Sequence, residues 1–156
     1  MDALAEASAF LFREARLLDQ RSWDAWLDLF TPDGLYWAPL RHDQPDGINH
    51  ASLFHEDALM REVRARRLEE KRAWSQQPVT QAARIVGNIF LLPEQDGDLM
   101  VASTFHMLEW RRRDHRMLGG QYTHRLRRTE DGLRIVLKRI DLIDCDAVHD
   151  ALETFL

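Results

Sequence analysis

The sequence is poor in several features that mark particular classes of protein. Cys145 is the only cysteine among 156 residues, which excludes an internal disulfide and a thiolate cluster for zinc or iron–sulfur. The formal net charge is −5, whereas a nucleic-acid-binding surface needs clustered basic residues. No apolar run approaches the ~20 residues of a membrane span, and the basic-then-apolar pattern of a secretory signal is missing. We therefore expect a cytoplasmic protein that binds neither nucleic acid nor membrane.

Catalytic motifs with a fixed local pattern are missing as well. The sequence has no G-x-G-x-x-G dinucleotide motif, no P-loop, no G-x-S-x-G nucleophile elbow and no H-E-x-x-H zinc motif. It does contain an ordinary globular mixture, with 45% hydrophobic and 30% charged residues. Its length suits a single domain over residues 1–156.

Hydrophobic spacing predicts two helices at the start of the chain. Apolar residues recur every three or four positions over residues 2–19, which indicates one amphipathic helix. Ser22 is a suitable N-cap for a second, short helix. The sequence TPDG at residues 31–34 predicts a turn, and an aromatic strand is expected from Leu35 onward.

A third helix is predicted over residues 56–73, after a polar loop at residues 42–49. Its apolar residues are expected to face the core, and these are Leu59, Met60, Val63 and Leu68. Its basic residues are expected to point mostly outward, as a solvated or partner-facing surface, and these are Arg61, Arg64, Arg66, Arg67, Lys71 and Arg72.

The rest of the chain alternates in the manner of β-strands. Residues 83–92 predict a strand with a bulge or bend at Gly87, and a hairpin turn then leads to a strand over residues 99–111. Two further strands flank the turn TEDG, and a short apolar tail covers residues 147–156. Helices that precede a run of antiparallel strands indicate an α+β fold, with the helices on one face of a curved sheet.

Two histidines are candidates for a site on the inner wall of this sheet. If the hairpin after residues 99–111 is centred near His115, His106 falls opposite His124, and even-numbered residues such as Tyr122 share the inward face. Three roles are open for such a pair. It could act as acid and base near neutral pH, supply two of three metal ligands, or form a hydrogen-bonded pair in the core.

Asp19 is a second candidate. A carboxylate at the end of the first helix, close to a cavity mouth lined by Tyr36 and Trp37, could abstract a proton as a general base. Alternatively, Asp19 caps the second helix or pairs with an arginine such as Arg16 or Arg139. One carboxylate with no recognisable oxyanion partner leaves both interpretations open.

Three long stretches of the chain resemble the small (β) subunit of aromatic-ring-hydroxylating dioxygenases, which are Rieske non-heme iron oxygenases. They cover nearly the whole chain in the right order, and they read FLFREARLLDQRSWDAWLDLFTPDGLYWAPL, SLFHEDALMREVRARRLEEKRAWSQQPVTQAARIVGNIF and GGQYTHRLRRTEDGLRIVLKRIDLID. The middle stretch discriminates best. It departs from the family at Gly87-Asn88, where serine-asparagine is usual.

This resemblance implies a cone-shaped α+β fold of the cystatin-like or nuclear-transport-factor-like kind, with helices on one strongly curved, mainly antiparallel sheet. It implies a large α subunit that carries the Rieske 2Fe–2S cluster and the mononuclear Fe(II), and a hetero-hexamer of three α and three β subunits with the β chains as a trimeric base. It also implies no cofactor, metal or catalytic residue on this chain. The lone cysteine agrees, because a Rieske centre needs two cysteines and two histidines.

The resemblance thus implies a non-catalytic structural subunit of an NADH-linked oxidoreductase that dihydroxylates aromatic compounds during their catabolism. The pocket candidates would then be scaffold residues, and these are Asp19, Tyr36, Trp37, His106, Tyr122 and His124. The alternative is a stand-alone cone-fold isomerase or dehydratase, with acid–base groups at Asp19, Tyr36, His106 and His124. A small-molecule binding module is a third possibility.

Overall fold

The computed structural model describes residues 2–48, 50–74, 79–111, 113–144 and 154–156. Helices and short strands come first, in the order α1 (Ala3–Asp19), α2 (Trp23–Leu27), β1 (Phe30–Pro39), β2 (Ser52–Glu56) and α3 (Ala58–Trp74). Four long strands follow, β3 (Gln81–Gln95), β4 (Asp98–Arg111), β5 (Asp114–Thr129) and β6 (Gly132–Leu142). None of the helices within these ranges is long and apolar enough to cross a lipid bilayer.

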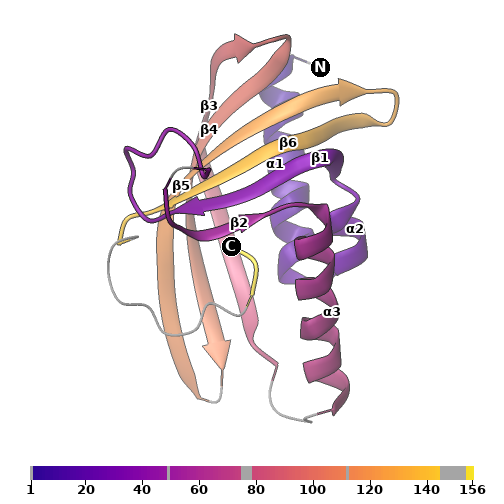
Figure 1. Cartoon of the computed structure of the whole chain (residues 1–156), viewed down its shortest axis with the longest axis vertical. Coiled ribbons are helices and arrows are strands. Elements are labelled where there is room, and N and C mark those ends of the chain that lie inside the picture. The colour runs from indigo at the N-terminus through magenta and orange to yellow at the C-terminus, as the bar shows by residue number, and fades with distance from the viewer. Residues whose placement is uncertain (1, 49, 75–78, 112, 145–153) are drawn as a thin grey trace.

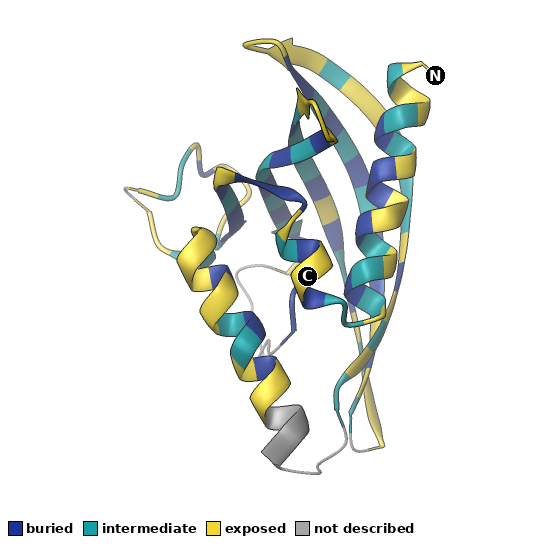
Figure 2. Cartoon of the chain, turned by 90° about the vertical axis from the view of Figure 1, so that its right-hand side faces the viewer, coloured by how far each residue is buried: buried dark blue, intermediate teal, exposed yellow. Residues whose placement is uncertain are grey.

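The six strands form one curved sheet in the order β2-β1-β6-β5-β4-β3 (Figure 1). β1 runs parallel to β6, and every other neighbouring pair is antiparallel. Helix α1 lies along the sheet (Figure 2), and its buried residues are Ala7, Phe10, Leu11, Glu14 and Leu18. The α+β class and the mainly antiparallel sheet are therefore as the sequence predicts.

The helices at the start of the chain agree with the sequence pattern in detail. α1 begins after Asp2, which is its N-cap and accepts a hydrogen bond from the Ala5 amide at 2.7 Å. α2 begins after Ser22, although the Ser22 side chain makes no capping hydrogen bond. The bulge predicted at Gly87 is confirmed by a register shift between Gly87 and Phe90 in the β3–β4 ladder.

Two boundaries near β1 differ from the prediction. β1 begins at Phe30, so residues 31–34 lie within the strand and do not form a turn before it. Its pairing with β6 shifts register between Phe30 and Leu35, which accommodates the Pro-Asp-Gly sequence. The short strand β2 was not predicted, and α3 starts at Ala58 because residues 52–56 pair with β1.

The orientation predicted for α3 is wrong over its first two turns. Leu59, Met60 and Val63 were expected to be buried, but they are 68%, 51% and 43% exposed. Arg61 was expected to point outward, but it is only 1% exposed. Leu68 is buried as predicted, and the side chains of residues 71–74 lie outside those that the structure describes.

One aromatic ring and two main-chain carbonyl groups explain why Arg61 faces inward on α3. The Arg61 guanidinium donates to the main-chain oxygens of Gly34 at 2.7 Å and Glu56 at 3.0 Å. It also lies 3.9 Å from the centroid of the Phe30 ring. These contacts satisfy a buried cation, because the donors are hydrogen-bonded and the planar group stacks on an aromatic face.

The β4–β5 hairpin has a different centre from the one predicted. Arg111 pairs with Asp114, so the ladder is centred between these two residues and not near His115. His106 is therefore opposite Gly119, while His124 is opposite Val101. An odd shift in register moves every side chain of one strand to the other face. The two histidines consequently lie on opposite faces of the sheet, with His106 exposed and His124 buried.

Gly120 on β5 lies where the neighbouring strand leaves no space for a side chain. A Cβ atom at Gly120 would lie 2.2 Å from the main-chain oxygen of Asp141, whereas one at Gly119 would meet nothing closer than 3.4 Å. We expect Gly120→Ala to lower the free energy of unfolding by about 1–3 kcal/mol, because β5 and β6 must move apart. Gly119→Ala is the matched control and should change it little. Equal losses in thermal denaturation of the two variants would contradict this account.

Candidate functional site

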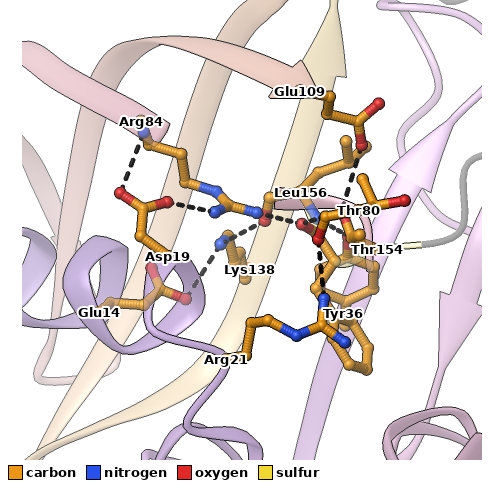
Figure 3. A network of polar contacts seen from close by, with 11 residues as sticks. Glu14, Asp19, Arg21, Tyr36, Thr80, Arg84, Glu109, Lys138, Thr154 and Leu156 are labelled. Atoms are coloured by element: carbon orange, nitrogen blue, oxygen red, sulfur yellow. Dashed lines mark hydrogen bonds and ion pairs between the residues drawn. The ribbon is translucent and has the colours of Figure 1, made fainter. Parts of the chain in front are cut away.

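A cluster of charged side chains is buried between α1 and the sheet. Its centre is Glu14 of α1, which is 2% exposed and sits beside His124 of β5 and Lys138 of β6, both fully buried. Glu14 Oε1 lies 2.8 Å from His124 Nε2. Glu14 Oε2 accepts hydrogen bonds from Lys138 Nζ at 3.0 Å and from Trp26 Nε1 at 2.9 Å (Figure 3 shows the lysine contact). Both oxygens of this carboxylate are therefore within hydrogen-bond distance of groups from three other elements.

The surroundings of Glu14 set its protonation state. Burial by itself raises the pKa of Glu14, but the charges of Lys138 and His124 and the hydrogen bonds to the carboxylate outweigh this effect and hold the pKa well below its ordinary value. Burial lowers the pKa of Lys138 to about 8, against the attraction of Glu14. Glu14 is thus an ionised carboxylate and a weak base, which suits it to holding its partners in place and not to proton abstraction.

Asp19 forms an ion pair with an arginine that the sequence analysis did not select. Its Oδ2 accepts from the Arg84 amide at 3.0 Å, and its Oδ1 accepts from the Arg84 guanidinium at 2.6 Å. The prediction that Asp19 pairs with an arginine is confirmed, but the partner is Arg84 and not Arg16 or Arg139, and the N-cap of α2 is Ser22 and not Asp19. Arg139 instead donates to Asp141 at 2.8 Å.

Tyr36 and Trp37 are neighbours on β1 and therefore point to opposite faces of the sheet. Tyr36 is fully buried, and its hydroxyl accepts a hydrogen bond from the Leu156 amide at 2.8 Å. Burial raises the pKa of Tyr36 to about 12. Trp37 donates to Ser52 Oγ at 2.9 Å and lies under the Arg139 guanidinium, 4.5 Å from its ring centroid. The expectation that both rings line one cavity mouth is therefore wrong.

Tyr122 lies on the inner face as predicted, next to His124. Its ring stacks on Phe105 with the centroids 4.1 Å apart, and burial raises the pKa of its hydroxyl well above the ordinary value. His106 lines a separate surface pocket with Met117 and Ile143, on the other side of the sheet. The structure thus brings Tyr36, Tyr122 and His124 together and leaves His106 out.

The predicted histidine pair cannot share a proton or a metal, because the sheet separates the two rings. Within the described ranges, no group of three or more histidine, cysteine, aspartate or glutamate side chains is placed to hold a metal ion. A stand-alone isomerase or dehydratase built on Asp19, Tyr36, His106 and His124 is therefore not supported by the geometry, since those four groups do not converge.

The sequence analysis missed the charged residues at the centre of the cluster, Glu14, Arg84 and Lys138. A signal was present for Glu14, which follows Leu11 by three positions and precedes Leu18 by four on the apolar face of α1. A lone carboxylate on such a face needs a buried partner. No comparable signal marks Lys138, because a register shift in the β5–β6 ladder breaks the alternation along β6.

Comparison with known proteins decides the family. The family model for the ring hydroxylating beta subunit matches residues 13–147. The chain belongs to this family. The expected identity as a β subunit, the cone-shaped α+β fold and the role of a structural component of a dioxygenase are thereby confirmed.

Individual β subunits agree over nearly their full lengths. The 2-halobenzoate 1,2-dioxygenase small subunit of Burkholderia cepacia is 30% identical, over 94% of this β subunit and 92% of its own length. Benzene 1,2-dioxygenase subunit beta of Pseudomonas putida is 33% identical, over 89% of this β subunit and 80% of its own length. The crystal structure of the benzoate 1,2-dioxygenase β subunit of Burkholderia mallei matches with a TM-score of 0.81 and 26% identity, over 99% of each chain.

The ionised state of Glu14 predicts that this β subunit loses stability in acid. Because the folded-state pKa of Glu14 lies below its ordinary value of 4.5, the folded state binds fewer protons, and stability falls as the pH drops below that value. Between about pH 4.5 and about pH 3, protonation of Glu14 in the unfolded state should lower the free energy of unfolding by about 2 kcal/mol. Urea unfolding of the natural chain and of Glu14→Gln measures it. The same pH slope in both proteins would contradict the assignment.

Proposed function

We propose that this chain is the structural β subunit of a terminal oxygenase that adds both atoms of dioxygen to an aromatic ring. It assembles with a large α subunit as three α and three β subunits, and the β chains form a trimeric base that positions the α subunits. The family match over residues 13–147 carries this proposal. An aromatic substrate for the complex is supported by the names of the relatives, which act on 2-halobenzoate and benzene.

In this complex the α subunit carries the Rieske 2Fe–2S cluster and the mononuclear Fe(II), and electrons arrive from NADH in the cytoplasm. Neither the cysteine count of the chain nor the arrangement of the side chains that the structure describes fits such a centre. One cysteine is too few for a Rieske ligand set, and the buried carboxylate Glu14 is already occupied by Lys138, His124 and Trp26. The contribution of this chain is therefore contact surface.

Exposed apolar side chains on the outer face of the sheet support such a contact surface. We define the outer patch as five exposed residues on β3, β4, β5 and the segment after β6, namely Ile85, Leu108, Trp110, Met117 and Ile143. Leu108 is paired with Met117 across the β4–β5 ladder, so these side chains lie side by side. Contiguous apolar surface of this kind is typical of subunit interfaces.

Co-expression with the large subunit tests this proposal. The purified complex should convert aromatic compounds with NADH and dioxygen, and the β chain alone should convert none. Asp19→Asn and His106→Ala should leave turnover per intact complex within about twofold, because neither group touches the reacting atoms. A fall of roughly a thousandfold, about 4 kcal/mol of barrier, would contradict the structural role.

Assembly is tested separately through the outer patch. Replacing both Leu108 and Met117 with aspartate should prevent the hexamer from forming, because two charges would be buried without partners. The matched control is Ile48→Asp, since Ile48 is also exposed but lies in the loop between β1 and β2. Size-exclusion chromatography with light scattering measures the outcome, and hexamers in both variants would place the interface elsewhere.

A further inference from the structure

β3 lies at one end of the sheet, so within the described residues only its edge toward β4 is paired. The other edge presents main-chain N–H and C=O groups, and an edge of this kind attracts extended segments of other molecules. The β3–β4 ladder is regular from Gln81 to Gly87 and is then interrupted by the bulge. Because a bulge disturbs further pairing, residues 81–87 are the stretch of this edge where another strand could best be added.

Two side chains, one from the last residue of α1 and one from the turn after it, already bond to this edge. The Arg84 amide donates to Asp19 Oδ2 at 3.0 Å, and the Arg21 guanidinium donates to the main-chain oxygen of Thr80 at 2.8 Å (Figure 3). Main-chain groups alternate between the two edges of a strand, so residues 80 and 84 direct theirs to the same side. Asp19 and Arg21 therefore occupy one donor and one acceptor that an added strand would use.

The backbone at Arg21 is strained. The amides of Arg21 and Ser22 donate to the main-chain oxygens of Leu18 and Leu17, at 3.1 Å and 2.9 Å, which is the Schellman motif that ends many helices. Glycine is usual at the position of Arg21, because the motif needs a positive φ there, and the φ angle of Arg21 is +59°. An arginine strains the backbone where glycine would not, and its side chain adds the bond to Thr80.

Exposed apolar side chains beside this edge would stabilise an added strand. Phe12 of α1 is 53% exposed and Ile85 of β3 is 76% exposed, and both line a groove of about 470 Å³ between α1 and β3. Asp19 and Arg84 line the same groove. The blocked main-chain groups and the apolar surface therefore lie together, and pairing at this edge would remove part of that surface from water.

We propose that Asp19 and Arg21 block strand addition at the free edge of β3, and that a second copy of this chain pairs there, β3 to β3, when both side chains are removed. A second copy fits because it carries the same edge, and two identical edges related by a twofold axis run antiparallel. The role of Asp19 is therefore to occupy a main-chain donor and not to abstract a proton. This inference concerns the chain alone and does not depend on the α subunit.

The test is the double variant Asp19→Ala/Arg21→Gly, which removes both side chains from the edge. Light scattering after size exclusion should show a mass that rises with concentration to about twice that of the natural chain or more, since each free edge joins two copies. The single variant Arg21→Gly should associate more weakly, with little change in its unfolding midpoint in urea, because glycine relieves the strained backbone. A larger mass without lower stability separates strand pairing from aggregation of unfolded chains.

Two further variants are the controls. Asp19→Asn removes the charge but keeps an oxygen that accepts from the Arg84 amide, so this variant should keep the mass of the natural chain. Ala82 lies midway between Thr80 and Arg84, so its amide also faces the free edge, and a proline there removes the donor. Adding Ala82→Pro to the double variant should therefore restore the natural mass.

The proposal is overturned if the double variant keeps the natural mass at every concentration up to its solubility limit, or if Asp19→Asn associates as strongly as the double variant. It is also overturned if Ala82→Pro leaves the association unchanged, because the copies would then meet at another surface. If circular dichroism shows the double variant to be unfolded, Arg21→Gly decides, and its mass must exceed that of the natural chain. None of these outcomes bears on the proposed subunit role, which co-expression with the α subunit tests.

Discussion

Replacing Lys138 with methionine is expected to lower the free energy of unfolding by about 3–5 kcal/mol, which is the range for breaking a buried ion pair on one side. Glu14 would stay buried with its charge compensated less completely, and the Leu156 oxygen would lose its donor. Methionine keeps much of the length of the side chain, so the loss reports the charge and not a cavity. Urea denaturation of the natural and variant chains measures it.

A surface ion pair provides the matched control for this prediction. Arg66 of α3 pairs with Asp24 of α2, and both side chains are exposed. Exposed pairs contribute little because water screens them, so Arg66→Met should leave the unfolding midpoint unchanged. The double variant Glu14→Gln/Lys138→Met should lose less than the sum of the single variants. Strictly additive losses would contradict a direct interaction between Glu14 and Lys138.

Replacing Phe155 with alanine is the second substitution with a large expected effect. The ring is fully buried among aromatic side chains, and truncations of this size in a core lower the free energy of unfolding by about 3–5 kcal/mol. Thermal or urea denaturation measures the loss. The effect should be accompanied by a change in tryptophan fluorescence, because Trp23 and Trp26 both contact the ring.

Phe12 is the matched control for Phe155. It is the same residue type, but it lies on α1 with 53% of its surface exposed. Phe12→Ala should change stability little, because the ring buries less surface and alanine favours the helix. If Phe155→Ala lowers stability no more than Phe12→Ala does, residues 154–156 do not contribute to the core in the way described.

Local patterns were sufficient for the elements whose residues interact with near neighbours. The spacing of Leu11 and Leu18 sets the buried face of α1, and glycine at position 87 marks the bulge in β3. Such signals lie within a few residues of one another, so they are readable without knowing what packs against them. The same local information misjudged Arg61, because its partners are the carbonyls of Gly34 and Glu56 and the ring of Phe30.

The pairing registers of β4 with β5 and of β5 with β6 decide which side chains reach the candidate site. The pairing of His106 with Gly119 follows from a ladder centred between Arg111 and Asp114, two and a half residues before the centre that was predicted at His115. Because side chains alternate, a shift that changes the odd–even pairing reverses which face a residue occupies. Lys138 is hidden from sequence analysis for a related reason, since the shift between Arg125 and Leu126 changes the phase of burial along β6.

The sequence by itself determined the family, the α+β class, the opening helices and the improbability of a Rieske centre on a chain with one cysteine. Those properties follow from residue identity, order and local spacing. Only the tertiary structure decided that Asp19 pairs with Arg84, that Glu14, His124 and Lys138 form one buried cluster, and that residues 154–156 enter it. Each of these contacts joins residues 18 or more positions apart in the chain, and their energies depend on burial and register that no local pattern records.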